Sequence, residues 1–308
     1  MRESDPISRT LAGTSRVVTR AAAQARFVLN RVSADLAASA WPEMAFRFSS
    51  LTNTGFPVEF AWSSRDPSLR FTFEVAPAET PDENRLPKAL KFLAELGVEG
   101  FQAAHDLQKA QIGVPLSFGA WVGARCSGVH ESYKIYVEMP PGSANDAWAQ
   151  SILDTAAIPL RGPSLVWRMA GLDAEGGIEL YARAPNLDAT TLRALVFQLD
   201  SDPETFLVPM CCLVRQDGPP TASGVSFAFD ASGAFAGLTL FVFAKHLYAS
   251  DSCACAALLA LGKTYGLDTV LYEALCEGEG DGRWRHGMIG IGLQRDGMVW
   301  LQAGVRPT

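Results

Sequence analysis

The chain has few of the features that mark metal, redox or membrane proteins. Its six cysteines form no CxxC pair and have no histidine partner at ligand spacing, which favours buried free thiols over a structural metal or a disulfide. The longest apolar run, Ala236 to Ala244, is much too short to span a bilayer. The four histidines, His105, His130, His246 and His286, share no spacing, so we expect surface or structural roles for them rather than catalytic ones.

An excess of positive charge is also missing. The 308 residues include 26 Lys and Arg against 33 Asp and Glu, a formal net charge of −7. Binding to nucleic acids or anionic membranes needs a cationic surface, so we expect neither partner. Because the chain as a whole is negatively charged, an anionic ligand must be bound by a local cluster of Lys and Arg. The first residues, Met1 to Pro6, contain no apolar core typical of a secretion signal, and we expect a cytoplasmic protein.

Helical spacing recurs along the chain. The segment from Arg16 to Ser39 is rich in Ala, Arg, Leu and Val, which predicts a long helix that ends before Pro42, with residues 1–15 as a flexible N-terminus. Further helices are expected at 84–96, 101–112, 145–157 with Asn145 as cap, 188–199 with Asp188 as cap, 204–214 with a kink at Pro209, 253–265 with Asp251 or Ser252 as cap, and 269–276.

Between the helices lie hairpins with one apolar and one polar face. In the first, Val58, Phe60 and Trp62 alternate with polar residues that include Glu59, and Arg70 occupies the polar face of the returning strand. The five expected hairpins pair 57–64 with 69–75, 117–125 with 133–139, 164–170 with 177–184, 224–229 with 237–245, and 287–293 with 298–305. The alternation is poorer in the fourth hairpin.

Ten strands with helices in every gap between hairpins predict an α+β fold, a closed antiparallel barrel surrounded by helices. An open sheet of this size would leave edges to protect, and closure removes them. With helices outside, the apolar faces must point outward and the polar faces inward, which makes the lumen a binding chamber. We expect a single domain over residues 1–308. The alternative is two α+β domains that divide near residue 160, but no linker separates them and the repeat continues across that boundary.

The polar faces predict the chemistry of such a chamber. Arg and Lys in a confined space would bind a compact anion such as phosphate or pyrophosphate, and tyrosines can bind phosphate oxygens and present ring faces to a cation. A carboxylate beside them suits a general base. Each residue alone is explained as a solvated strand position, and only their joint occurrence at matching positions favours a chamber. The expected lining residues are Glu59, Arg70, Lys134, Tyr136, Glu179 and Tyr181, with Arg183, Lys245 and the last strand as additions.

These hairpins resemble those of the ABBA prenyltransferases, whose barrel of repeated α-β-β-α units binds an allylic diphosphate and its acceptor. Residues 58–62 and 69–74 look like the first hairpin of that family, in which a Glu contacts the acceptor and an Arg the pyrophosphate. Residues 133–136 look like its Lys-x-Tyr-type strand, and residues 177–182 like the next such strand. Chain length and the segments 123–125, 131–136 and 178–182 look closest to the cyanobactin peptide prenyltransferases.

This resemblance implies transfer of a dimethylallyl or longer prenyl group from its diphosphate to a side chain of a cyclic peptide natural product. The acidic segment Glu277 to Asp281 would suit a peptide at the barrel mouth. Alternatives are a small indole or phenol acceptor, and a non-catalytic ligand-binding barrel. The implied roles are catalysis by Glu59, diphosphate binding by Arg70, Lys134, Tyr136, Tyr181 and Lys245, and an acceptor pocket of Glu179, Trp121, Phe227, Phe241 and Trp300.

The sequence departs from the family pattern in its phosphate clamp. Phe241 and Phe243 stand where the family often has Tyr or Lys, and Glu179 stands where many small-aromatic members have Lys. The last strand offers Trp300 and Gln302 with no Tyr pair. Resemblance to the peptide branch implies Mg²⁺ as a source of the missing positive charge, although no Asp-rich motif provides ligands for it. We expect no organic cofactor, and a protein that acts as a monomer.

Overall fold

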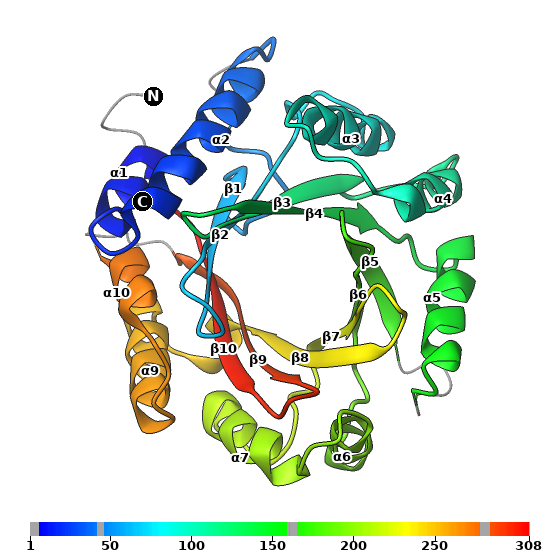
Figure 1. The fold of residues 1–308 in the computed structure, drawn as a ribbon, viewed down its shortest axis with the longest axis vertical. Coiled ribbons are helices and arrows are strands. Elements are labelled where there is room, and N and C mark those ends of the chain that lie inside the picture. Colours follow the sequence, from blue (N-terminus) through cyan, green and yellow to red (C-terminus); the bar gives the residue numbers. More distant parts are fainter. Residues whose placement is uncertain (1–5, 42–45, 159, 161–164, 278–283, 308) are drawn as a thin grey trace.

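Ten strands form one closed barrel in the computed structural model, which describes residues 6–41, 46–158, 160, 165–277 and 284–307. Each strand pairs antiparallel with the next in the chain, and β1 closes the barrel against β10 (Figure 1). The predicted α+β barrel is thereby confirmed. The strands are β1 Val58–Ser63, β2 Leu69–Phe73, β3 Ala120–Cys126, β4 Glu131–Glu138, β5 Val166–Asp173, β6 Ile178–Arg183, β7 Gly224–Phe229, β8 Phe235–Phe243, β9 His286–Gln294 and β10 Val299–Val305.

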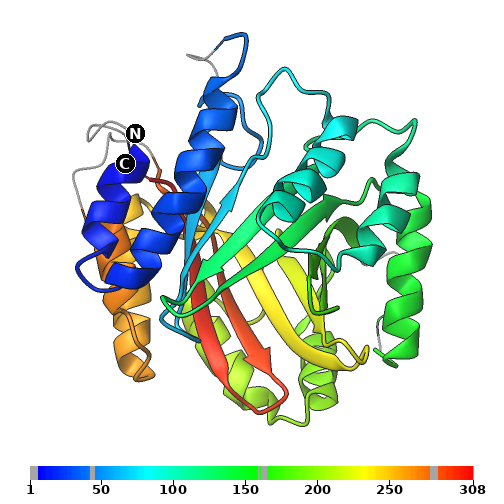
Figure 2. The ribbon, with the colours of Figure 1, turned by 45° about the horizontal axis from the view of Figure 1, so that its top comes forward.

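Helices surround the barrel on its outside (Figures 1 and 2). Among the described residues, none of these helices is both long and apolar enough to cross a bilayer. The helices are α1 Pro6–Thr14, α2 Thr19–Ala37, the short 3₁₀ helix η1 Asp82–Asn84, α3 Arg85–Glu95, α4 Gln102–Gln111, α5 Ala144–Thr155, α6 Ala189–Gln198, α7 Pro203–Val214, α8 Ala244–Leu247, α9 Asp251–Thr264 and α10 Val270–Cys276.

The apolar face of each hairpin packs against the helices. Trp62 of β1 stacks on Tyr272 of α10 at 4.7 Å between ring centroids, and Phe73 of β2 meets Phe92 of α3 edge-on at 5.4 Å. Residues on this face are buried, whereas their neighbours Glu59 and Arg70 on the inner face keep partial exposure. Each buried large apolar side chain contributes about 2 to 3 kcal/mol, so this packing fixes the register. The polar faces therefore point into a solvent-accessible interior, as predicted.

The N-terminal segment differs from its prediction as a flexible tail. Residues 6–14 form α1, which buries Ile7 and Leu11 and packs against α2 and α10. A nine-residue helix is marginal alone and gains its stability from such packing, a contribution that local sequence does not reveal. The helix expected from residue 16 begins only at Thr19.

Helix caps follow the expected chemistry but not always the expected residue. Asp188 caps α6 as predicted, accepting from the Thr191 backbone N–H at 2.7 Å. Ser143 caps α5 in place of Asn145, and Ser250 caps α9 in place of Asp251 or Ser252. Each actual cap precedes the predicted one by one or two positions, where the backbone is still extended.

The cysteines are free thiols, but burial was overestimated for several of them. Cys126 is buried, whereas Cys212 and Cys253 are exposed on the helix layer.

The third hairpin also differs from prediction, because β5 continues through the expected turn to Asp173. Gly171, expected in that turn, therefore pairs with Glu179 of β6 within the sheet.

Glycines on the inner face make room for large side chains. A Cβ on Gly292 of β9 would lie 2.1 Å from the ring of Trp300, its cross-strand partner. A Cβ on Gly123 of β3 would lie 2.9 Å from the ring of Tyr136. These rings therefore lie directly over backbone, and the interior keeps space that ordinary residues would fill.

Gly292→Ala is expected to destabilise the protein by about 1 to 3 kcal/mol, because the added methyl group must displace Trp300. Urea unfolding measures the effect. Gly224→Ala is the matched control, since a Cβ there would meet its nearest atoms at 3.6 Å, an ordinary contact. Equal unfolding free energies for the two variants would contradict the proposed packing of Trp300 on Gly292.

Candidate active site

The β1–β2 turn places one carboxylate among three arginines. Asp66 forms an ion pair with Arg70 of β2, and its Oδ2 lies 4.0 Å from both Arg65 Nε and Arg125 Nη1. Arg125 on β3 is the cross-strand partner of Arg70. The other oxygen, Oδ1, accepts a hydrogen bond from the Ser68 backbone N–H at 3.0 Å. Residues from the turn and two strands thus converge on one point.

Burial and repulsion from neighbouring arginines lower the pKa of Arg65 and Arg70. The pKa of Arg70 is lowered to about 10: burial is the largest cause, Arg125 and Arg65 act in the same direction, and Asp66 opposes them. Burial alone would raise the pKa of Asp66, but Arg70, Ser68 and Arg125 outweigh it and the pKa is lowered. Asp66 and Arg70 are therefore both charged at neutral pH.

Lys134 and Glu179 form a second ion pair on the inner face. Lys134 Nζ donates to Glu179 Oε2 at 2.7 Å, and Ser226 Oγ donates to Glu179 Oε1 at 2.6 Å. Burial opposes ionisation of Glu179, but Lys134 and these hydrogen bonds lower its pKa to about 2. Together, these two ion-paired clusters contain four basic side chains, those of Arg65, Arg70, Arg125 and Lys134, and two carboxylates, those of Asp66 and Glu179. This excess of positive charge suits a multivalent anion.

Aromatic rings lie beside this charged group. The rings of Tyr136 and Tyr181 meet edge-on at 5.9 Å, and Phe241 of β8 lies 6.0 Å from Tyr181. Burial, together with the charge of Glu179, raises the pKa of Tyr181 well above its ordinary value, so this hydroxyl stays a neutral donor. The rings can present π faces to a cation beside this charged group.

Glu59 lies against the last two strands of the barrel. A Cβ on Gly287 would fall 2.3 Å from Glu59 Oε1, and one on Gly304 would fall 2.6 Å from its carboxyl carbon, so a side chain at either position would displace the Glu59 carboxyl. Within the described ranges, no hydrogen bond or ion pair to this carboxylate is found. Burial raises its pKa to about 7, which leaves the group partly ionised at neutral pH. Such a carboxyl can accept and return a proton.

The raised pKa of Glu59 predicts a stability that falls with rising pH. The unfolded chain ionises this carboxyl near pH 4.5, whereas the folded protein keeps the proton until about pH 7, so stability is lost between these values. Glu59→Gln should remove this loss, and we expect its advantage in unfolding free energy to grow by about 2 to 3 kcal/mol between pH 5 and pH 8. Urea unfolding of both proteins at the two pH values measures it. A pH-independent difference would show that the carboxyl is not desolvated.

Both predicted tryptophans lie on inner faces with fixed orientations. The Trp121 ring stacks on Phe118 at 3.8 Å and its Nε1 donates to Glu74 Oε1 at 3.0 Å. The Arg65 guanidinium lies over the Trp300 ring at 5.3 Å from its centroid. These rings can present flat surfaces to an aromatic ligand.

Two predicted site residues do not belong to the interior wall. Phe227 is fully buried on the outer face of β7, where its ring meets Trp167 edge-on at 6.3 Å. Both faces of the fourth hairpin carry phenylalanines, which concealed its orientation. Lys245 lies in α8 instead of a strand, is exposed, and stands over the Phe243 ring at 5.7 Å.

Sequence reasoning missed Arg65, Asp66, Arg125 and Ser226. The sequence signal for Arg125 was its alternation with the small or apolar residues Ala124 and Cys126, which places it on the inner face of its strand.

His286 is structural, as expected. It is buried outside the barrel, with Nδ1 2.8 Å from Asp251 Oδ1 and Nε2 2.7 Å from the Tyr272 hydroxyl.

The described residues do not fit a resident Mg²⁺. No group of three or more His, Cys, Asp or Glu among them could hold a metal ion. The two carboxylates of the charged group, Asp66 and Glu179, are already ion-paired with Arg and Lys. Mg²⁺ therefore has no protein ligands prepared for it in this part of the structure.

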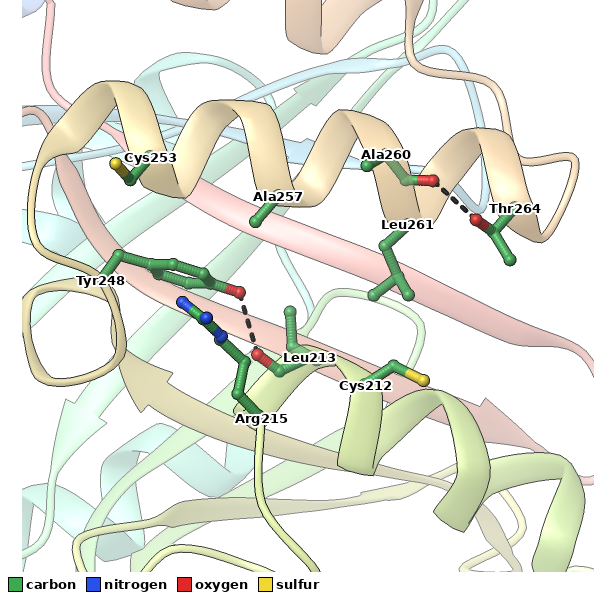
Figure 3. A pocket seen from close by; sticks show the side chains of 9 residues that line it. All are labelled: Cys212, Leu213, Arg215, Tyr248, Cys253, Ala257, Ala260, Leu261 and Thr264. Atoms are coloured by element: carbon green, nitrogen blue, oxygen red, sulfur yellow. Dashed lines mark hydrogen bonds between the residues drawn. The ribbon is translucent and has the colours of Figure 1, made fainter.

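A groove on the outside of the molecule is separate from these residues. It lies between α7 and α9, encloses about 360 Å³, and is partly bridged by the hydrogen bond from the Tyr248 hydroxyl to the Leu213 carbonyl at 2.9 Å (Figure 3). Its lining includes Arg215 but none of the charged inner-face residues. The groove therefore does not contribute to the candidate active site.

No family model matches the chain, and no curated protein sequence does so either. Solved structures do. The 5-dimethylallyl tryptophan synthase from Streptomyces coelicolor, in complex with DMASPP and Trp, superposes with a TM-score of 0.77 at 17% identity over 98% of this chain and 95% of that one. The prenyltransferase PriB in its apo form gives 0.75 at 15% identity over 98% and 96%. The 6-dimethylallyltryptophan synthase from Micromonospora olivasterospora gives 0.74 at 15% identity over the whole of both chains, 100% and 100%. The chain therefore has the barrel fold of the ABBA-type prenyltransferases.

Proposed function

We propose that this protein transfers an allylic prenyl group from its diphosphate to an aromatic acceptor. The observation that carries the proposal is the joint presence, inside one barrel, of two clusters rich in Arg and Lys and of the Glu59 carboxyl, whose pKa burial raises to about 7. Structures of the same fold support it: one is a ternary complex of PriB with L-tryptophan and dimethylallyl thiolodiphosphate.

The cations act on the leaving group. Arg70 and Lys134, with the hydroxyls of Tyr136 and Tyr181, would bind the diphosphate oxygens while the bond between C1 and the bridging oxygen breaks. The electron pair of that bond leaves with the diphosphate, whose growing negative charge the cations stabilise. The allylic cation that remains lies beside the rings of Tyr136, Tyr181 and Phe241, which stabilise it through their π faces.

Glu59 acts on the acceptor. The aromatic ring of the acceptor attacks C1 with a pair of π electrons, which forms the new bond and places positive charge on the acceptor. Glu59 orients the acceptor by accepting a hydrogen bond from its N–H or O–H, and takes up the proton that must leave. A carboxyl with a pKa of about 7 is suited to this step, because its ionised form is present at neutral pH and is basic enough to accept a proton.

The acceptor we propose carries an indole or a phenol. Trp121 and Trp300 on the inner face offer stacking surfaces for such a ring. The predicted peptide acceptor depended on the acidic segment Glu277 to Asp281, of which residues 278–281 lie outside the described residues. A peptide with a Trp or Tyr side chain remains the alternative acceptor.

Mass spectrometry of the products tests the function. The protein is incubated with dimethylallyl diphosphate and, in separate reactions, tryptophan, simple phenols, and linear or cyclic peptides with one Trp or Tyr, each with Mg²⁺ or with EDTA. We expect a single added prenyl group on an indole or phenol. Modification of peptides alone would favour the peptide acceptor. Diphosphate binding without any product would favour the non-catalytic barrel.

A further inference from the structure

We infer that the Asp66 carboxylate occupies, in the absence of ligand, the position that a phosphate oxygen takes when the diphosphate binds. The diphosphate would then replace Asp66 as the partner of the arginines, and Arg65 and Arg125 would bind it together with Arg70. The inference rests on the proposed function for the identity of the anion. It adds Arg65 and Arg125 to the proposed diphosphate ligands, and it gives Asp66 the role of a carboxylate that competes with the diphosphate.

The geometry around Asp66 Oδ2 is that of an anion site. Guanidinium groups from the β1–β2 turn, from β2 and from β3 approach this single oxygen: Arg70 pairs with it, and Arg65 and Arg125 each have a nitrogen at 4.0 Å. Guanidinium groups bind carboxylate and phosphate oxygens in the same way, so the arrangement suits either. The two longer distances show that one carboxylate oxygen does not satisfy all three arginines.

Unused donors remain after Asp66 has been bound. Arg70 Nε is buried and has no hydrogen-bond partner within the part of the chain that the structure describes. A buried, unpaired guanidinium nitrogen costs free energy that an additional anionic oxygen would recover. Arg65 is held over the Trp300 ring, which keeps its charge beside the other two arginines in the absence of ligand.

The net positive charge of the three arginines and Asp66 also favours the binding of an anionic ligand. One carboxylate neutralises only one of the three arginines, and the repulsion that remains contributes to the lowered pKa values of Arg65 and Arg70. Glu179 and Asp296 also act on Arg65, but neither forms an ion pair with it among the described contacts. A diphosphate supplies the negative charge that the arginines lack, and the standing contact with Asp66 would limit how tightly it is held.

The turn itself does not require the charge of Asp66. Its structural contact is made by Oδ1, which accepts from the Ser68 N–H, and an asparagine in the same position can accept that hydrogen bond equally well. Asp66→Asn therefore removes the negative charge and keeps the turn. Asp66→Ser provides a second variant with an acceptor for the same backbone N–H.

Calorimetric titration with inorganic pyrophosphate, without Mg²⁺, tests the inference on the full chain. We expect Asp66→Asn to bind pyrophosphate about tenfold more tightly than the wild type, with a steeper dependence on salt, because one competing charge is removed. Arg125→Ala should bind it about tenfold more weakly. Asp106→Asn, which removes an exposed carboxylate of α4 that pairs with Lys109 and not with these arginines, is the matched control and should stay within about twofold.

Equal or weaker binding by both Asp66 variants would overturn the inference, as would an absence of pyrophosphate binding in every protein. Thermal unfolding of each variant shows whether the turn has been kept. Prenyl transfer is assayed separately, so the two proposals can fail independently. Tighter binding by Asp66→Asn without any transfer product would support the anion site and refute the proposed reaction, whereas transfer with unchanged binding would do the reverse.

Discussion

Glu59→Gln is expected to lower the turnover of prenyl transfer by about 10²- to 10⁴-fold, while the affinity for inorganic pyrophosphate changes by less than about twofold. The amide cannot take up a proton, but it has nearly the same size and still fits against Gly287 and Gly304. The cations that bind the diphosphate are untouched. Steady-state kinetics with dimethylallyl diphosphate and the acceptor found by mass spectrometry, together with pyrophosphate titration, measure the two effects.

The pH profile separates proton transfer from a loss of packing at Glu59. In the wild type, turnover should rise with pH through an apparent pKa of about 7, because the base acts when ionised, and Glu59→Gln should lose this rise. Glu95→Gln removes a carboxylate from the outside of α3 and should leave the profile unchanged. Unaltered turnover in Glu59→Gln would remove this residue from the mechanism.

The sequence was sufficient to predict the barrel because strand alternation has a period of two. Once Phe60 and Phe71 are assigned to one face, Glu59 and Arg70 must occupy the other, whatever the loops do. The same rule placed Lys134 and Tyr136 on the inner face of β4, where the structure has them. Closure followed from the need to protect the edges of ten strands.

Strand alternation cannot assign a face to residues in turns or to strands that carry apolar residues on both faces. Arg65 and Asp66 lie in a turn, where no face is defined, so their convergence with Arg125 depends on the three-dimensional path of the chain. On β7 and β8, phenylalanines occur on both faces, and Phe227 and Phe241 were assigned together although they point in opposite directions. α1 likewise depends on contacts with α2 and α10, which lie far from it in sequence or beyond a turn.

The position of Lys245 shows how a single strand boundary can change a functional assignment. If β8 continued to residue 245, the lysine would share the inner face with Phe241 and Phe243. The backbone instead enters α8 at Ala244, and the lysine is exposed beyond the end of the strand. The diphosphate site that we propose therefore depends on cations of the first two hairpins, and Arg70 lies at its centre.

Arg70→Ala is accordingly expected to lower kcat/KM for the allylic diphosphate by about 10²- to 10⁴-fold and to weaken pyrophosphate binding to a similar extent. Two charge-assisted hydrogen bonds to phosphate oxygens are lost, each worth about 1.5 to 3 kcal/mol. Arg125 and Arg65 remain next to Asp66, so this carboxylate is not left unpaired and the fold should persist. Kinetics at varied donor concentration and calorimetric titration measure the loss.

Two further variants show whether the loss of activity depends on the guanidinium group and on its position in the barrel. Arg70→Lys keeps the charge but not the planar, two-pronged donor, and should recover only part of the activity. Lys245→Ala removes an exposed cation near the end of β8 and should change kcat/KM by less than about twofold. If Lys245→Ala lost as much activity as Arg70→Ala, the diphosphate would have to lie near α8, and the assignment of Arg70 as the central ligand would be wrong.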